Sequence, residues 1–258
     1  MLTDVESLLH PTRLGPVLAA ATADEGWRTF EAQLIAGGKS NLTFELRSAA
    51  GDLILRRPPV GKLLPSAHDM AREARVQRAL ATTRVPVASI VFVESSAQTL
   101  ETPFYVMEKV NGHVIRDAMP PGYAETPEDR RKMADALVDT LVELHGIEPA
   151  SVGLEDFGRP EGFLARQVRR WKGQSEATRS RDVPELDALA AALEANLPAS
   201  PPPAIVHGDF RLDNCLMDSA DPGRVAAVLG MMAGQDFGNV DAEVVRLAGA
   251  GLDALEVA

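Results

Sequence analysis

The chain reads Val-His-Gly-Asp-Phe-Arg-Leu-Asp-Asn at residues 206–214, which places an acid, Asp209, five residues before an amide, Asn214. Apolar runs at 204–206 and 215–217 flank this stretch, so we expect a short strand, a loop and a second strand. Phosphoryl transfer needs a carboxylate that orients and deprotonates a hydroxyl, and an oxygen ligand nearby that holds magnesium. The loop carries one side chain of each kind, so the sequence predicts phosphoryl-transfer chemistry here.

Upstream of this loop, the first 110 residues have the pattern of a sheet. Residues 42–47 alternate apolar and polar side chains, as a half-buried strand does, and residues 49–52 form a hairpin turn into the next strand. We expect a short helix, three strands, a longer helix and two more strands, over residues 11–23, 29–35, 42–47, 53–57, 66–80, 89–94 and 104–110.

The segment between this sheet and the loop is helical in pattern. Two proline-containing breaks, at 120–122 and 126–127, precede it. Helices are expected over residues 128–146, 163–171 and 186–197. The whole chain is therefore predicted to be an α+β protein of two lobes. Residues 1–110 form an antiparallel sheet with a helix, and residues 111–258 form a mostly helical lobe that carries the loop at 205–218.

Composition argues against several classes of protein. Twenty-six basic against 37 acidic residues give a net charge of −11, whereas a general nucleic-acid binder would show a basic face. The one cysteine, Cys215, allows no internal disulfide, and we expect a packed thiol in a reducing compartment. No apolar run approaches the ~18 residues that span a bilayer, and the N-terminus, with Asp4 and Glu6, lacks the pattern of a signal peptide. We therefore expect a cytoplasmic protein that binds neither nucleic acid nor membrane.

A glycine-containing turn joins the first two predicted strands. It reads Gly37-Gly38-Lys39-Ser40-Asn41. Glycines let a backbone approach phosphates closely and direct N–H groups toward them. A plain hairpin turn explains the same residues, so both interpretations stay open.

A cation and a carboxylate in the first lobe form a second candidate feature. Arg56 or Arg57 closes the third strand, where a cation either pairs with nucleotide phosphates or simply lies on the surface. Glu73 shares a helix face with Met70 and Leu80, so we expect it to point inward. A semi-buried carboxylate favours a cationic partner, and Arg56 is the obvious candidate.

The last predicted strand of the first lobe, residues 104–110, becomes polar where the two lobes join. Its backbone there can donate to and accept from the edge of an adenine ring. Glu108 and Val110 lie in that polar end, so they are predicted to belong to the same nucleotide site.

His207, next to Gly208 and Asp209, raises the alternative of a metal hydrolase. Imidazole and carboxylate are good metal ligands, but no second histidine is near in the sequence, since His113 and His145 lie well upstream. We expect His207 to brace the loop around Asp209 instead.

These motifs together resemble the aminoglycoside phosphotransferase family, whose fold is protein-kinase-like. Residues 207–214 match the family's catalytic-loop signature, H-G-D-x-x-x-x-N. Residues 36–43, 55–59 and 104–108 resemble one subgroup, the kinase-like domains found alongside acyl-CoA dehydrogenases. The resemblance runs from about residue 28 to residue 229.

The resemblance implies a role for each of these residues. Asp209 would be the base for the acceptor hydroxyl, Asn214 a magnesium ligand, and Arg56 the phosphate-pairing cation that kinases supply as a lysine. Glu73 would be the helix partner of that cation, residues 107–110 the hinge that contacts adenine, and the glycine turn a phosphate cradle. The implied cofactors are ATP and Mg²⁺, and the implied substrate is a small hydroxylated molecule.

A further strand is predicted over residues 224–229, and the chain departs from the family pattern directly after it. The family places there an Asp that holds the catalytic metal, and this chain has Gly230 instead. Asp236, in the triplet Asp236-Phe237-Gly238, superficially resembles the kinase metal-binding triplet and is the candidate replacement ligand. The helices that complete the acceptor pocket in relatives have no recognisable counterpart in residues 230–258, so the second lobe is expected to be incomplete.

Two functions from different classes therefore remain. The first is an ATP-dependent O-phosphotransferase of a small hydroxylated molecule, with turnover impaired by Gly230 because a metal ligand is lost. The second is a catalytically inactive, nucleotide-binding pseudokinase or an interaction protein, in which the glycine turn, Arg56 and the hinge still hold a nucleotide.

Overall fold

The computed structural model describes residues 5–35, 41–60, 69–199 and 202–230. Their contacts group them into two compact units. The first unit takes in the described residues up to Glu143 together with 207–230, and the second takes in 144–206. The Asp209–Asn214 loop therefore belongs to the same compact unit as the N-terminal sheet. The lobe boundary at residue 110 stays a prediction.

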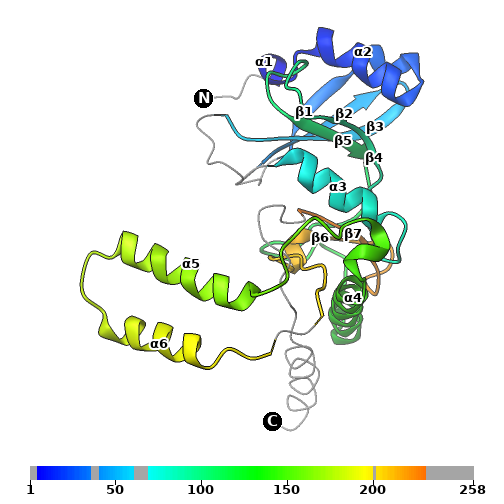
Figure 1. Ribbon diagram of the computed structural model, residues 1–258. Helices are drawn as coiled ribbons and strands as arrows, with labels where there is room; N and C mark the ends of the chain where they lie inside the picture. The colour runs from blue at the N-terminus through cyan, green and yellow to red at the C-terminus, as the bar shows by residue number, and fades with distance from the viewer. Residues whose placement is uncertain (1–4, 36–40, 61–68, 200–201, 231–258) are drawn as a thin grey trace. The chain divides into compact units, whose positions relative to one another are not determined.

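Five antiparallel strands form the sheet of the first unit (Figure 1). Their bounds are β1 Glu31–Leu34, β2 Leu42–Ser48, β3 Gly51–Arg57, β4 Ile90–Glu94 and β5 Phe104–Glu108. They run in the order β1-β2-β3-β5-β4, so β3 lies between β2 and β5. A two-residue turn joins β2 to β3, and Gly51 allows it with a φ of 127°, a conformation that other residues rarely adopt. The five predicted strands are confirmed.

Different helices cover the two faces of this sheet (Figure 1). Those of the first unit that do so are α1 (Val5–Leu9), α2 (Pro11–Thr22) and α3 (Met70–Leu80). Helices α1 and α2 pack on the face that carries Leu55 of β3, whereas α3 packs on the face that carries Ile54. Side chains alternate along a strand, so Arg56 lies on the α3 face and Arg57 on the opposite one.

Several of the predicted boundaries in this unit were wrong by two residues or more, including the starts of β1, at 31 rather than 29, and of β3, at 51 rather than 53. Helix α3 begins at Met70, and the prediction over 66–80 started it too early. The Asp69 side chain accepts a hydrogen bond from the amide of Arg72 at 2.9 Å, so Asp69 is the N-cap. Strand β5 ends at Glu108 rather than at 110. Helix α4 (Pro127–His145) lies within one residue of its prediction at both ends.

The Asp209–Asn214 loop leads into a short antiparallel hairpin of β6 (Cys215–Met217) and β7 (Val225–Val228), which confirms the predicted strands on that side. The strand predicted at 204–206 does not form. Ala204 and Ile205 of this apolar run are buried and Val206 is half-buried, and burial alone does not supply a partner strand.

Backbone hydrogen bonds attach this hairpin to the connections of the five-stranded sheet. The amide of Val228 donates to the carbonyl of Pro86 at 2.8 Å, just before β4. His113 and Met217 exchange two further bonds, of 2.8 and 2.9 Å, after β5. Gly112 allows this approach, because a Cβ there would lie 2.5 Å from the Met217 carbonyl oxygen. The loop is thereby held to the same framework as β3 and α3.

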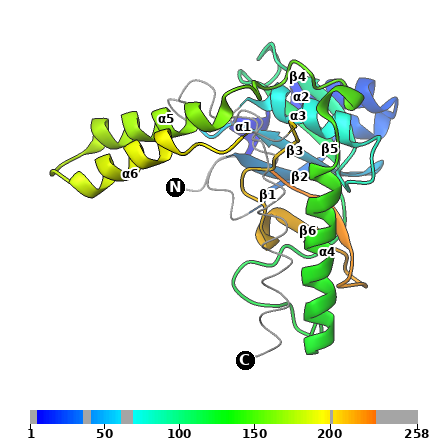
Figure 2. The ribbon, with the colours of Figure 1, turned by 60° about the horizontal axis from the view of Figure 1, so that its bottom comes forward.

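The second unit contains a helical hairpin of α5 (Phe163–Thr178) and α6 (Pro184–Ala195), which run side by side (Figure 2). Helix α5 is longer than the predicted 163–171, and α6 is close to the predicted 186–197. Neither helix has a buried residue, and Arg179 pairs with Asp187 at 2.6 Å. This hairpin therefore has little core of its own.

The elements of both units confirm the α+β class. In the described part of the chain, we find no helix with the length and apolar character needed to cross a bilayer.

Candidate active site

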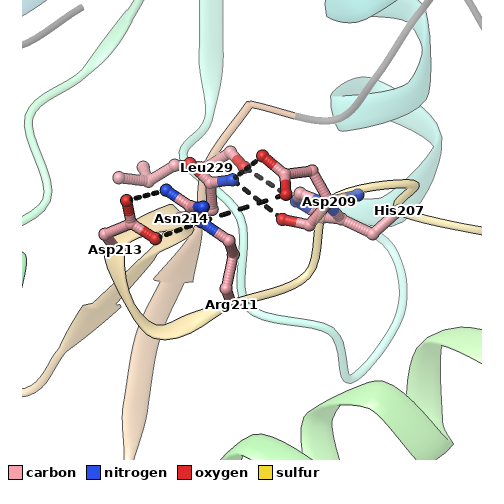
Figure 3. Close-up of polar contacts among 6 residues, drawn as sticks. All are labelled: His207, Asp209, Arg211, Asp213, Asn214 and Leu229. Carbon is pink, nitrogen blue, oxygen red and sulfur yellow. Dashed lines mark hydrogen bonds and ion pairs between the residues drawn. The ribbon is translucent and has the colours of Figure 1, made fainter. Parts of the chain in front are cut away.

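The loop brings together the two side chains that the sequence singled out. Asn214 ends a short 3-10 turn, Leu212–Asn214, just before β6. Its Nδ2 donates to the Oδ2 of Asp209 at 2.9 Å and to the carbonyl oxygen of Asp209 at 2.8 Å (Figure 3). The Asp209 carboxylate is therefore held through one oxygen, and the Asn214 amide oxygen takes no part in either bond.

His207 braces this loop, as predicted, and is only 1% exposed. The amide of Asp209 donates to its Nδ1 at 3.3 Å, so Nδ1 is the acceptor nitrogen. Its Nε2 therefore carries the proton and donates to the carbonyl of Leu229 at 2.8 Å (Figure 3). Burial lowers the pKa of this imidazole, which favours its neutral form. Both nitrogens are engaged, which argues against the alternative of a metal hydrolase built on His207.

The backbone places residue 230 beside the loop. The amide of Leu229 donates to the carbonyl of Asn214 at 2.8 Å, and Gly230 follows directly with a φ of 65°. The position that carries an acid in the family pattern is therefore next to Asn214, where this chain has no side chain. Asp236 lies outside the described residues.

Arg211 and Asp213 complete the loop. The sequence predicted that Asp213 caps a backbone amide or supports the two key residues, and it assigned no role to Arg211. Arg211 forms a bidentate ion pair with Asp213, in which Nε of Arg211 lies 2.6 Å from Oδ1 of Asp213. The same Nε lies 3.9 Å from Oδ1 of Asp209 (Figure 3). The hydrogen bonds from Arg211 lower the pKa of Asp213. The alternation of acid, base and acid at 209, 211 and 213 was the available signal, and it places a cation beside Asp209.

On the α3 face of the sheet, Arg56 and Glu73 form the predicted pair. Nη1 of Arg56 lies 2.5 Å from Oε1 of Glu73, and the two side chains are 15% and 4% exposed. Nη1 also donates to the hydroxyl of Tyr105 on β5 at 3.3 Å. The sequence analysis missed Tyr105, because its position opposite Arg56 depends on the pairing of β3 with β5.

The structure decides between the two arginines that close β3. Arg57 points to the opposite face, where its Nη1 donates to the carbonyl of Leu8 at 2.5 Å. Arg56 instead faces α3, where Glu73 and Tyr105 hold its Nη1. The Nε atoms of both arginines are buried without a partner among the described residues, so the two differ in the face and the partners and not in Nε. A buried guanidinium N–H without an acceptor is costly, so Arg56 has a donor left for a ligand.

The remaining candidates for nucleotide contact are only partly described. Residues 36–40, with Gly37, Gly38 and Ser40, lie outside the described residues. The Nδ2 of Asn41 donates to Oε2 of Glu73 at 3.4 Å. Glu108 is exposed and Val110 half-buried. The contact of either residue with a nucleotide stays a prediction.

Lys109, between them, ties this segment to the sheet. Its Nζ lies 2.6 Å from Oε1 of Glu45 on β2 and 3.0 Å from Oδ2 of Asp52 on β3. Two strands therefore hold the chain that leaves β5, which fixes the path of the predicted hinge.

Sequence comparison agrees with this geometry. A model of the phosphotransferase enzyme family, APH, matches residues 31–230. Acyl-CoA dehydrogenase family member 11 of Rattus norvegicus is 40% identical over 193 residues, which are 74% of this chain and 24% of that protein. The chain thus spans about a quarter of the length of this curated relative.

Solved structures share the fold. A protein of Ralstonia eutropha JMP134 classed with aminoglycoside phosphotransferases matches with a TM-score of 0.73 at 30% identity, over 92% of this chain and 66% of that one. A variant of aminoglycoside phosphotransferase APH(4)-Ia, in a ternary complex with ADP and hygromycin B, matches with a TM-score of 0.57 at 16% identity, over 88% of this chain and 73% of that one. The neighbours confirm the predicted protein-kinase-like fold with its antiparallel N-terminal sheet.

Proposed function

Since the chain belongs to the phosphotransferase enzyme family, we propose that it is an ATP-dependent O-phosphotransferase whose acceptor is the hydroxyl of a small molecule. The pair of hydrogen bonds from Asn214 to Asp209 is the observation that supports this most directly. These bonds fix the Asp209 carboxylate in the loop that carries the H-G-D-x-x-x-x-N signature. Oδ1 of Asp209 is left to accept a hydrogen bond from the hydroxyl of the substrate.

In this proposal Asp209 orients the acceptor and takes its proton. Its Oδ2 is occupied by Asn214, so the acceptor hydroxyl donates to Oδ1. The Asp209 side chain is 49% exposed, which leaves room for a substrate to reach it. The Arg211 guanidinium, 3.9 Å away, offers positive charge where the phosphoryl group is transferred.

Arg56 binds the nucleotide phosphates. Its Nη1 is held by Glu73 and Tyr105, and its Nε still lacks an acceptor among the described residues. The ADP complex of the APH(4)-Ia variant supports a nucleotide as the ligand. Residues 107–110, and the glycine turn that ends at Asn41, are the proposed contacts for the base and the phosphates.

Magnesium fits the described residues incompletely. This ion usually binds through one or two carboxylates plus substrate phosphates, and it would neutralise charge that develops during transfer. Asn214 offers one amide oxygen and Gly230 offers no side chain, and the described residues contain no group of three or more acids, histidines or cysteines able to hold a metal. Asp236 remains the proposed second ligand, and turnover is proposed to be slow for this reason.

The acceptor class follows from the relatives. The name of the rat relative refers to acyl-CoA chemistry. We therefore propose a hydroxylated acyl thioester, or a similar hydroxyl compound, in preference to an aminoglycoside. The match covers about a quarter of that relative, so the proposal concerns the kinase-like domain alone.

A coupled assay with ATP and a panel of hydroxylated acceptors tests the proposed reaction. The panel contains hydroxyacyl thioesters and aminoglycosides, and wild-type protein is compared with Asp209→Ala. The matched control is Asp221→Ala, which removes an exposed acid from the turn between β6 and β7. Turnover that survives Asp209→Ala would rule out the assigned base.

Gly230 favours a second candidate, a nucleotide-binding protein without turnover. Thermal unfolding with ATP, measured with and without magnesium, separates the two candidates. Stabilisation that depends on magnesium supports the enzyme, and stabilisation by ATP alone supports the nucleotide-binding protein. If neither condition raises the unfolding temperature, both candidates fail.

A further inference from the structure

The carboxylate of Glu73 accepts hydrogen bonds from two other parts of the first unit. Arg56 of β3 donates to its Oε1, and Asn41, just before β2, donates to its Oε2. Tyr105 of β5 contacts the Arg56 side of this pair. Tyr105 lies directly opposite Arg56 in the ladder between β3 and β5, so the backbone fixes their mutual distance.

The Tyr105 hydroxyl holds the same nitrogen of Arg56 that Glu73 holds. It accepts a hydrogen bond from Nη1 of Arg56 at 3.3 Å. Tyr105 is fully buried and Glu73 is 3% exposed. Burial raises the pKa of the Tyr105 phenol, so the group keeps its proton.

These two hydrogen bonds hold the guanidinium of Arg56 by one end only. Both use Nη1, whereas Nε is buried without a partner among the described residues. A guanidinium that bonds one carboxylate through one nitrogen can still rotate about that bond. The second bond, to an oxygen carried by a neighbouring strand, removes that freedom.

We propose that Tyr105 is a positioning residue for the nucleotide phosphates, because its hydroxyl fixes Arg56 in the orientation that presents the remaining N–H donors to them. The inference rests on the proposed function. Preorganisation of this kind strengthens binding by lowering the cost of ordering the side chain when the ligand arrives. The effect applies to the phosphates and not to the base, which binds elsewhere in the proposed site.

The test compares two ligands on one isosteric variant. Tyr105→Phe removes the hydroxyl and keeps the ring, and isothermal titration measures the affinity of ATP and of adenosine for the full chain. We expect the Kd of ATP to rise about tenfold, the scale of one hydrogen bond to a charged group. The Kd of adenosine, which has no phosphate, is expected to stay unchanged.

Tyr123→Phe is the matched control. Tyr123 is also buried, 6% exposed, and its hydroxyl donates to the carbonyl of Asp218 at 2.7 Å, away from Arg56. Both variants lose one buried hydroxyl, and thermal unfolding reports whether each one is folded. Only Tyr105→Phe is expected to weaken ATP binding selectively.

The outcomes separate this inference from the proposed function. If Tyr105→Phe binds ATP as well as the wild type does, or loses ATP and adenosine affinity equally, the positioning role is wrong and the proposed function stands. If the wild-type chain binds adenosine but not ATP, or binds neither ligand, the proposed function itself fails. In that case the role of Tyr105 fails with it.

Discussion

The two polar clusters of the first unit differ in how the fold holds them. The first cluster, Arg56, Glu73 and Tyr105, comes from three elements and is almost fully buried. The side chains of Arg56 and Glu73 are 15% and 4% exposed. Asp209 and Asn214 come from one loop, and the Asp209 side chain is 49% exposed. The first cluster is made by long-range packing, whereas local hydrogen bonds make the second.

This difference predicts which property each cluster controls. A buried charge must be satisfied inside the fold, so losing its partner costs stability. An exposed carboxylate in a loop remains solvated without its partners, so losing it costs chemistry and little stability. Substitutions in the two clusters should therefore separate stability from activity.

The largest expected effect is on turnover, from Asp209→Asn. The amide keeps the shape of the carboxylate but cannot accept a proton, so kcat is expected to fall by about 10²–10⁴. The free energy of unfolding should change by less than about 0.5 kcal/mol. Urea denaturation and the coupled assay measure the two quantities. A rate within a factor of ~10 of the wild type would contradict the role of Asp209.

Glu73→Gln is the counterpart in the buried cluster. It leaves the Arg56 cation without a carboxylate, and we expect the free energy of unfolding to fall by about 3–5 kcal/mol. The control is Glu101→Gln, which breaks the exposed pair with Arg13 at 3.5 Å and should cost less than about 1 kcal/mol. Urea denaturation of both variants gives the difference.

A double substitution sharpens the same comparison. Arg56→Met with Glu73→Leu removes both charges and should recover most of the lost stability, since no buried ion is left unpaired. ATP affinity should not recover, because the phosphate-binding cation is gone. Equal losses in Glu73→Gln and Glu101→Gln would mean that burial does not distinguish the two ion pairs.

Gly230→Asp tests whether residue 230, which lies next to Asn214, is the missing metal-ligand position. It supplies a carboxylate next to Asn214, and we expect the magnesium-dependent turnover to rise about tenfold or more. The left-handed φ of 65° costs most residues with a side chain about 1–2 kcal/mol of stability, and Asp and Asn are among those that adopt it most readily. Gly230→Asn carries the same strain without the charge. An equal rate in the two variants would exclude residue 230 as a metal position.

The smallest expected effect is on the pH dependence of stability. Burial lowers the pKa of His207, so between the two pKa values the unfolded state binds more protons than the folded state. The contribution of His207 to the free energy of unfolding is therefore fully present above about pH 6.5, the pKa of histidine in the unfolded chain. This contribution is lost as the pH falls from there toward the pKa of His207 in the folded chain. Urea denaturation from about pH 7.5 to about pH 5 should show a loss of at most about 1.4 kcal/mol per pH unit for this group.

Single substitutions show how much each histidine contributes to this pH dependence of the free energy of unfolding. Burial also lowers the pKa of His145, so His207→Asn should flatten the slope in part and His145→Asn should remove the rest. The Glu45 carboxylate contributes at lower pH, because its partners Arg47 and Lys109 hold its pKa at about 2. Stability that rises as the pH falls from 7 to 5 would contradict a buried neutral His207.

Several parts of the site followed from local sequence patterns. The alternation over 42–47 and the turn at 49–52 predicted β2 and β3, because strand side chains have a period of two. The spacing of Asp209 and Asn214 predicted their contact, since the two residues are five apart in one loop. The pairing of Arg56 with Glu73 followed from the apolar face of a helix, which predicts that Glu73 points inward.

The errors share a different cause. An apolar run at 204–206 predicted a strand, but a strand needs a partner, and three residues cannot show whether one exists. The start of α3 was placed too early, because Asp69 rather than an earlier residue satisfies the first-turn amides. Both outcomes depended on contacts that a sequence pattern does not contain.

The amino-acid sequence therefore determined the family, the order of the elements and the pair of Asp209 and Asn214. Each of these depends on residues that lie close together along the chain. Tertiary structure decided that Arg56 rather than Arg57 faces α3, that Tyr105 joins the Arg56–Glu73 pair, and that residue 230 lies beside Asn214. These outcomes join residues from separate strands, and strand register and the helix that covers each face exist only in the folded chain.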